Sequence, residues 1–227
     1  MKKLTHTLPL MFLMLLGWIS VCQAQVDTNE VSDPEAMQLL QQISDTYQKG
    51  TGHKIEFSLD IELPAQGKET QKGQLIQQGD NFVLEMEGRK IISNGESVWL
   101  YMEDLNEVQI NDADFEDETT FSSPSDIFKL HTSGEYIFAV SNKFDEEGAA
   151  VTQIEGKPTD NYSEYSKMRL TVIDKGLNVK RLKIFGKDGS RYTMNILSHN
   201  DAYTPAAGVF GFDASQYEGV HVEDLRF

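Results

Sequence analysis

The clearest pattern in the chain is the strict alternation of apolar and polar residues over His53–Leu63. The apolar positions share one face of an extended chain and are Ile55, Phe57, Leu59, Ile61 and Leu63. Strict alternation of this kind predicts a strand of an antiparallel sheet, with one buried face and one solvated face.

Shorter stretches with similar alternation follow along most of the chain, separated by turn residues such as Gly, Asp and Asn. The later predicted strands lie at 70–78, 82–87, 91–93, 98–101, 107–110, 136–142, 150–155, 168–172, 182–184 and 192–196. Asn94-Gly95 predicts a tight type I′ hairpin turn, because that turn needs positive φ angles, which Asn and Gly tolerate. About eleven short antiparallel strands predict a mainly β fold.

Two stretches have helical periodicity instead. Asp33-Pro34 opens the first, with Asp33 as N-cap and Pro34 in the first turn, and Gly50 and Gly52 end it. Its apolar residues recur at three- or four-residue spacing and are Met37, Leu40, Ile43 and Tyr47. A second, short helix is predicted over 122–130.

About eleven strands, each with one apolar face, have more apolar surface than two short helices can bury. Exposed apolar surface costs about 25 cal/mol per Å², and curling the sheet so that its apolar face becomes concave reduces that exposure. The helices then lie across the opening as a lid. Met86, Met168 and Met194 fall on apolar faces, and Met adapts to varied apolar ligands. Periodicity leaves open whether they line a cavity or form an ordinary core.

The composition narrows the class of partner. A chain of 227 residues with 39% hydrophobic content is typical of one domain. Its formal charge of −16 argues against nucleic acid, whose phosphates need neutralisation by Lys and Arg. Anionic lipid head groups would also repel it.

The first 24 residues have the pattern of a cleaved signal peptide. Lys2-Lys3 is the basic region, Leu8–Ile19 is the apolar run, and Cys22-Gln23-Ala24 is a cleavage site before Gln25. Lipidation of Cys22 is the alternative, although Val21 is larger than the residue that lipoprotein processing favours there. Cleavage after Ala24 leaves a mature chain without cysteine, which tolerates an oxidising compartment such as a bacterial periplasm.

We therefore expect a periplasmic protein with a flexible N-terminus over 25–32 and a single domain over 33–227. Removal of Lys2 and Lys3 changes the formal charge from −16 to −18. No later run is long and apolar enough to predict a membrane span.

The sequence contains no motif for catalysis or metal binding. The histidines after the leader, His53, His131, His199 and His221, are far apart in sequence, and we expect surface positions for them. The chain contains no His-Glu-x-x-His, Gly-x-Ser-x-Gly or phosphate-binding glycine loop. The acidic loop Asn111–Glu118 fails as a calcium loop, because Asp117 and Ser123 stand where an EF-hand needs Gly and Glu. We expect no enzyme, no catalytic residue, no metal and no cofactor.

Several longer stretches carry a family resemblance. They are Ser93–Tyr101, Glu107-Val108, Ser123–Phe128, Val209–Asp213 and Glu218–Asp224. On these residues and on the order of the elements, the sequence resembles the LolA-type periplasmic carriers of outer-membrane lipoproteins. The resemblance implies a strongly curved, unclosed antiparallel β-barrel, with a short-helix lid over an apolar cavity that holds lipoprotein acyl chains.

In such a barrel the apolar faces of the strands should meet inside the curve, and the second helix should close over them. The lipid-binding residues expected on this basis are Phe57, Leu59, Ile61, Leu84, Met86, Trp99, Tyr101, Phe128, Leu170, Val172 and Met194.

The resemblance also implies a monomeric carrier that shuttles acylated lipoproteins from the inner to the outer membrane. Its implied partners are an inner-membrane lipoprotein-releasing ABC transporter and an outer-membrane acceptor. The alternative is a LolA-like module that senses lipids or lipoproteins in envelope signalling. In one feature the sequence departs from the family. The best-known members end the second strand with a basic residue and Pro, which help to hold the lid, whereas this chain has Gly79-Asp80.

Overall fold

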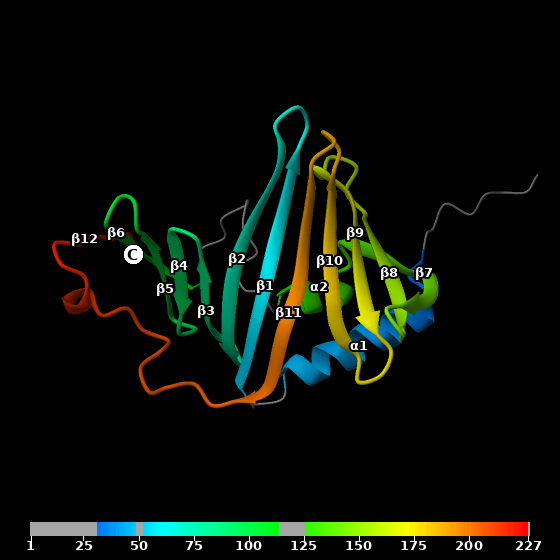
Figure 1. Cartoon of the computed structure of the whole chain (residues 1–227), viewed down its shortest axis with the longest axis horizontal. Helices are drawn as coiled ribbons and strands as arrows, with labels where there is room; N and C mark the ends of the chain where they lie inside the picture. The colour runs from blue at the N-terminus through cyan, green and yellow to red at the C-terminus, as the bar shows by residue number, and fades with distance from the viewer. Residues whose placement is uncertain (1–30, 49–51, 114–125, 227) are drawn as a thin grey trace, which may run out of the picture. The chain divides into compact units, whose positions relative to one another are not determined.

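The computed structural model describes residues 31–48, 52–113 and 126–226, and within them a single twelve-stranded sheet contains every strand (Figure 1). The helices are α1 (Pro34–Gln48) and α2 (Asp126–Ser133), with a short 3-10 turn, η1, at Ala214–Gln216. The strands are β1 (Gly52–Leu63), β2 (Gly67–Gln78), β3 (Asn81–Met86), β4 (Arg89–Ser93), β5 (Ser97–Met102), β6 (Glu107–Asp112), β7 (Tyr136–Glu146), β8 (Ala149–Pro158), β9 (Tyr165–Ile173), β10 (Asn178–Gly186), β11 (Arg191–Tyr203) and β12 (His221–Asp224).

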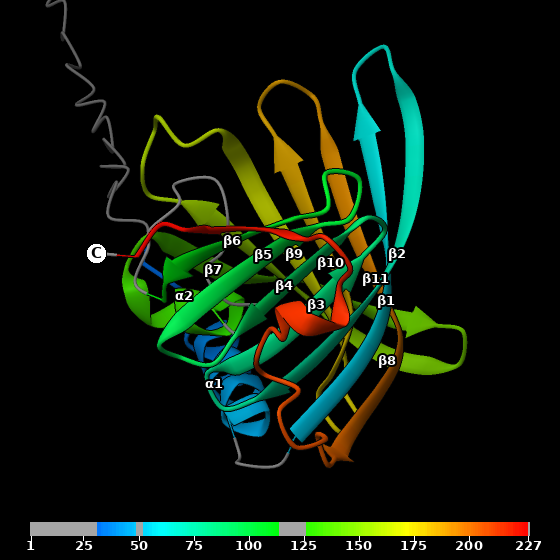
Figure 2. The same ribbon diagram turned by 90° about the vertical axis from the view of Figure 1, so that its left-hand side faces the viewer.

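The strand order across the sheet is β12-β6-β5-β4-β3-β2-β1-β11-β10-β9-β8-β7. All neighbours are antiparallel except β12, which runs parallel to β6. The sheet curves around the helices but does not close, because the outermost strands β7 and β12 do not pair with each other (Figure 2). The predicted mainly β, unclosed and curved architecture is therefore confirmed. The sequence pattern missed β12, whose four residues are all exposed and do not alternate.

The turn between β4 and β5 differs from the predicted type I′ hairpin. Gly95 has a positive φ of 83°, but Asn94 does not have a positive φ. The loop instead spans the three residues 94–96, and the Asn94 side chain accepts hydrogen bonds from the backbone N–H groups of Glu96 and Ser97. The Asn side chain thus bonds to its own backbone two and three residues on, as in an Asx turn, and stabilises a loop in which only Gly95 has a positive φ.

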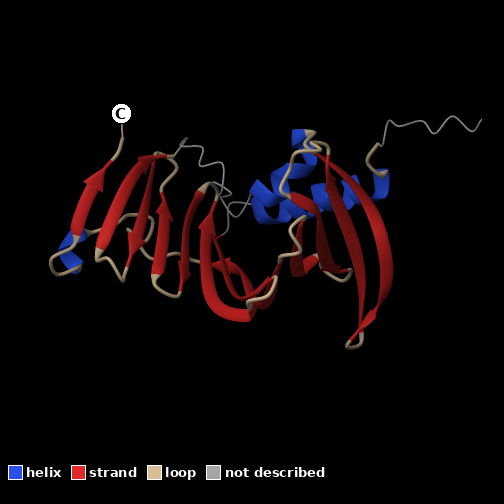
Figure 3. Cartoon of the chain, turned by 90° about the horizontal axis from the view of Figure 1, so that it is seen from above, coloured by secondary structure: helices blue, strands red, loops and turns tan. Residues whose placement is uncertain are grey.

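Helix α1 begins as predicted. The Asp33 carboxylate accepts a hydrogen bond from the backbone N–H of Glu35 at 2.9 Å, as an N-cap residue does. Its apolar stripe faces the sheet, and Ala36, Leu40, Ile43 and Tyr47 are each at most 4% exposed. Figure 3 shows the helices on the inner side of the curved sheet. None of the helices in the described part of the chain is long and apolar enough to span a membrane.

The main core lies between α1 and the inner face of the sheet. Two strand glycines make room for its largest rings. Phe57 lies against Gly73 of the neighbouring strand, and Phe138 lies against Gly156. A second, smaller cluster lies on the opposite face of β2–β4, where Ile76, Val83 and Ile92 are covered by residues of the C-terminal tail.

Candidate functional site

Several half-buried apolar side chains of the sheet border the main core, and six of them lie together on β1, β3, β4, β10 and β11. We call them the apolar strip: Leu59, Leu84, Met86, Ile91, Ile184 and Met194. Strand pairing places Leu59 opposite Met194, and Leu84 opposite Ile91. Each side chain contacts the core and still keeps part of its surface exposed. The strip therefore offers apolar surface beside the helices that a ligand can cover.

Four of the predicted lipid-binding residues belong to this strip: Leu59, Leu84, Met86 and Met194. A fifth, Ile61, lies two residues beyond Leu59 on the same strand and is also half-buried. Leu100 on β5 was not among the predicted residues. It lies opposite Ile91 of β4 and extends the inner face of the sheet. It could have been found only by knowing which face of β5 turns inward.

Three other predicted residues are packed core. Phe57 is 2% exposed, Leu170 is 6% exposed and Val172 is 1% exposed, all in the cluster that α1 covers. Met168 belongs to the same buried cluster, whereas Met86 and Met194 do not. The predicted inner face is therefore divided between a closed core under the helix and the half-buried strip.

Trp99 and Tyr101 were assigned to the wrong face. Trp99 packs against the outer cluster of Ile76, Val83 and Ile92. The Tyr101 ring lies 5.7 Å from the ring of Phe212 and 4.6 Å from that of Tyr217, both in the C-terminal tail. Strand β5 has bulky apolar residues on both faces, so alternation alone could not show which set points inward.

The prediction for Phe128 falls outside the residues whose side chains are described, as do those for most of the acidic loop Asn111–Glu118 and for the first 30 residues.

Helix α1 is fixed to the edge strand β7 at its N-terminal end. The backbone N–H of Asp33 donates to the carbonyl of Phe138 at 2.7 Å, and the N–H of Phe138 donates to the Ser32 hydroxyl. The Asp33 carboxylate also accepts from the N–H of Val140, and Lys143 pairs with Glu35 at 2.6 Å. These bonds satisfy part of the open edge of β7 and hold the helix over the sheet.

The C-terminal end of α1 is fixed by three stacked rings. The Tyr47 ring lies 5.3 Å from that of His53 on β1 and 5.1 Å from that of His199 on β11. His53 Nδ1 and His199 Nε2 are 3.1 Å apart and share a hydrogen bond. Burial lowers the pKa of both histidines, the nearby positive charge that a protonated His53 would carry lowers that of His199 further, and Asp201 opposes the shift. Burial also raises the pKa of Tyr47.

The predicted surface position is therefore wrong for His53 and His131, whereas His199 is half-buried and His221 is exposed as predicted. His53 is 1% exposed, and His131 is 7% exposed. His131 of α2 hydrogen-bonds to the Gln41 side chain of α1 at 3.0 Å, which links the two helices. The His53–His199 and His131–Gln41 contacts join residues far apart in the sequence, so sequence analysis could not detect them. Within the described ranges no three His, Cys, Asp or Glu side chains are grouped to hold a metal ion.

Comparison with known proteins places this arrangement in a family. The family model described as "Outer membrane lipoprotein carrier protein LolA" matches residues 61–213. No curated protein matches the sequence.

Two solved structures were among the matches, and the likeness of fold rests on the first of them. An uncharacterized conserved protein from Thermus thermophilus is 11% identical, with a TM-score of 0.55 over 81% of this chain and 98% of that one. A LolA superfamily protein from Nitrosomonas europaea is 12% identical, with a TM-score of 0.42 over 78% of this chain and 98% of that one. At these identities the likeness concerns the fold alone.

Proposed function

The chain belongs to the LolA family of outer membrane lipoprotein carrier proteins, and from this premise we propose that it is a periplasmic carrier that binds the acyl chains of lipoproteins. The observation that carries the proposal is the apolar strip. Its side chains pack against the edge of the core but are only half-buried, so part of their apolar surface remains exposed.

The strip has the chemistry that an acyl chain needs. Transfer of one methylene group from water to an apolar surface is favourable by about 0.8 kcal/mol, so a chain of ordinary length gains affinity from contact area alone. Met86 and Met194 have flexible, polarisable side chains, which adapt to chains that differ in length or branching. Contact of this kind is non-directional, which lets a carrier take many lipoproteins and release them again.

The remaining steps of the proposal follow the role of a carrier. The signal peptide over residues 1–24 delivers the chain to the periplasm, where it receives acylated lipoproteins from an inner-membrane ABC transporter. It passes them to an acceptor at the outer membrane. The formal charge, which changes from −16 to −18 once Lys2 and Lys3 are removed, supports this role, because an acidic protein is not retained by anionic lipid surfaces between transfers.

Direct titration tests the proposal. The mature chain from Gln25 is titrated with a fluorescent fatty acid, and a triacylated lipopeptide is then added as competitor. We expect saturable binding and displacement by the lipopeptide. The same peptide without acyl chains should not compete.

Absence of binding by both acylated probes would overturn the proposal. Mass spectrometry of lipid that co-purifies with the exported protein gives an independent reading of the ligand class.

A further inference from the structure

The outer face of the sheet carries a concentration of positive charge that the total charge of the chain conceals. Residues 165–200, which include β9 and β10 and most of β11, contain eight Lys and Arg against two Asp and Glu, a local charge of +6. The whole chain has a charge of −16. A contrast of this size within one sheet calls for a physical explanation.

Strand register brings five of these cations together, and we call them the basic face: Lys167, Arg169, Arg181, Lys183 and Arg191. Phe185 on β10 lies opposite both Lys167 on β9 and Arg191 on β11, and Lys183 lies opposite Arg169. The intervening residues Leu182 and Ile184 point inward and contact the core. The basic face therefore points away from the helices and from the apolar strip.

The ring of Phe185 lies at the centre of the basic face. Lys167 Nζ and Arg191 Cζ each lie 5.1 Å from the ring centroid, Arg169 Cζ lies at 5.4 Å and Lys183 Nζ at 5.5 Å. The negative face of an aromatic ring attracts cations, which helps to hold them together. Four cations around one ring still repel one another, so nearby negative charge stabilises the arrangement.

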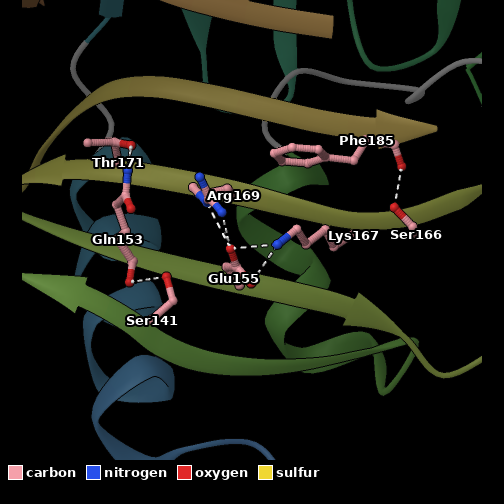
Figure 4. Close-up of polar contacts among 8 residues, drawn as sticks. All are labelled: Ser141, Gln153, Glu155, Ser166, Lys167, Arg169, Thr171 and Phe185. Atoms are coloured by element: carbon pink, nitrogen blue, oxygen red, sulfur yellow. Dashed lines mark hydrogen bonds and ion pairs between the residues drawn. The ribbon is translucent and has the colours of Figure 1, made fainter. Parts of the chain in front are cut away.

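Acids of the same sheet supply only part of that negative charge. Glu155 accepts hydrogen bonds from Lys167 and Arg169 (Figure 4). Burial alone would raise the pKa of Glu155, but these two cations lower it below its ordinary value. Glu146 pairs with Arg181 at 2.8 Å.

Neither Lys183 nor Arg191 forms an ion pair in the described part of the chain. However, Glu62 on β1 lies opposite Arg191 in the register, and hydrogen bonds from Ser190, with a smaller contribution from the charge of Arg191, lower the pKa of Asp188. Arg191 donates only to the backbone carbonyls of Gly186 and Ser190, and Lys183 contacts the Phe185 ring. Lys183 also lines a hollow of about 320 Å³, whose other lining residues are all polar and include Arg169 and Arg181. Two of the basic-face cations are thus available to an incoming negative group.

We propose that the basic face docks an acidic surface of a partner protein. The residues around it distinguish this partner from a membrane. Asp60 and Glu62 also line the hollow, and a bilayer with anionic head groups would repel them. A protein can present carboxylates to Lys183 and Arg191 and basic or neutral groups to the acids, which is how charge complementarity selects one partner.

The position of this surface has a consequence for any ligand on the inner face. The basic face and the apolar strip lie on opposite faces of the same strands, so a partner docked on one leaves the other uncovered. The inference does not depend on the lipid-carrier proposal, because docking and acyl binding are measured with different probes.

A charge-reversal experiment tests the docking surface. Lys183→Glu/Arg191→Glu is compared with Lys72→Glu/Arg89→Glu, which makes the same change in charge at two exposed positions away from the basic face. Binding of fluorescein-labelled poly-L-glutamate, a model for an acidic protein surface, is followed by anisotropy at low and at physiological salt. We expect the wild type to bind with an affinity that falls as salt rises. The basic-face variant should bind about tenfold more weakly or worse, and the control should keep most of its affinity.

Three results would overturn the proposal. The first is an equal loss of affinity in both variants, which would trace binding to net charge. The second is binding of the wild type to phosphatidylglycerol vesicles but not to poly-L-glutamate, which would make the occupant a membrane. The third is a salt-sensitive dimer in sedimentation, which would make it a second copy of the chain. Should circular dichroism show that the reversed variant is unfolded, Lys183→Gln/Arg191→Gln takes its place, with weakened binding again the expected result.

Discussion

Phe57 and Gly73 face each other across β1 and β2, and the ring of Phe57 occupies the space where a side chain at position 73 would begin. A Cβ atom on Gly73 would lie 2.3 Å from the ring Cζ atom and 2.9 Å from the backbone carbonyl oxygen of Glu85. Neither contact is possible without movement of the ring or the strand. Position 73 therefore accepts only glycine while the Phe57 ring keeps its place in the core under α1.

Gly73→Ala should therefore lower the free energy of unfolding by about 1–3 kcal/mol, the usual cost of overpacking a core. Chemical denaturation of the two proteins measures this difference. Gly211→Ala is the control, because a Cβ there meets only an ordinary contact at 3.7 Å, and we expect a change within about 0.5 kcal/mol. Equal effects of the two substitutions would contradict the packing argument.

Leu59→Glu should leave the fold intact but weaken binding of a fluorescent fatty acid by about tenfold or more, because a carboxylate repels an acyl chain. Leu59 is half-buried, so its carboxylate can reach water. Phe57→Glu places the same charge at a position only 2% exposed and should unfold the chain. Circular dichroism and probe titration separate the two outcomes. Unfolding of Leu59→Glu, or unchanged binding, would remove Leu59 from the proposed ligand surface.

Tyr101→Ala tests the corrected face of β5. The substitution removes the ring that contacts Phe212 and Tyr217, at a cost of about 1–2 kcal/mol for a half-buried aromatic residue. We expect faster proteolysis of the C-terminal tail and unchanged affinity for acylated probes. A strong loss of probe binding with an intact tail would return Tyr101 to the ligand surface.

The stacked rings at the end of α1 predict a pH dependence of stability. Burial lowers the pKa values of His53 and His199 in the folded chain, whereas in the unfolded chain they are near about 6.5. Below about pH 6.5 the two histidines bind protons in the unfolded chain but stay neutral in the folded chain. The free energy of unfolding should therefore be nearly constant above pH 6.5 and should fall as the pH decreases from there toward the lowered values.

Unfolding measured between about pH 7.5 and 5.5, where most carboxylates stay ionised, checks this dependence. His53→Phe keeps an aromatic ring beside Tyr47 and should flatten the curve. The exposed His221 is the control, since His221→Asn should leave the curve as it is. A curve that His53→Phe does not alter would assign the dependence to other groups.

The N-terminus of the exported protein gives a further prediction. We expect mass spectrometry to find a chain that begins at Gln25 and carries no lipid, because Cys22-Gln23-Ala24 ends in the small residue that signal peptidase cleavage favours. A diacylglyceryl group on Cys22 would contradict this prediction and would make the protein membrane-anchored.

Part of the candidate site could be read from alternation alone. Leu59, Leu84, Met86 and Met194 lie on faces where every second residue is apolar, so the pattern identified the inward face correctly. The same pattern could not separate Phe57 or Val172, which α1 buries, from Leu59, which it leaves half-exposed. Whether a helix packs over a given strand residue depends on the tertiary structure. The alternation of residues along a strand shows only which face each side chain is on.

The sequence by itself determined the elements: a meander of antiparallel strands, two helices and the Asp33 cap, because period, turn residues and capping residues act over a few neighbouring positions. Only the tertiary structure decided which face of β5 turns inward, and that β12 joins the sheet beside β6. It also brought His53 to His199 across 146 positions, and set Lys183 among the other cations around Phe185. These relationships arise where strands meet in register, and contacts between distant segments leave no periodic signal in either segment.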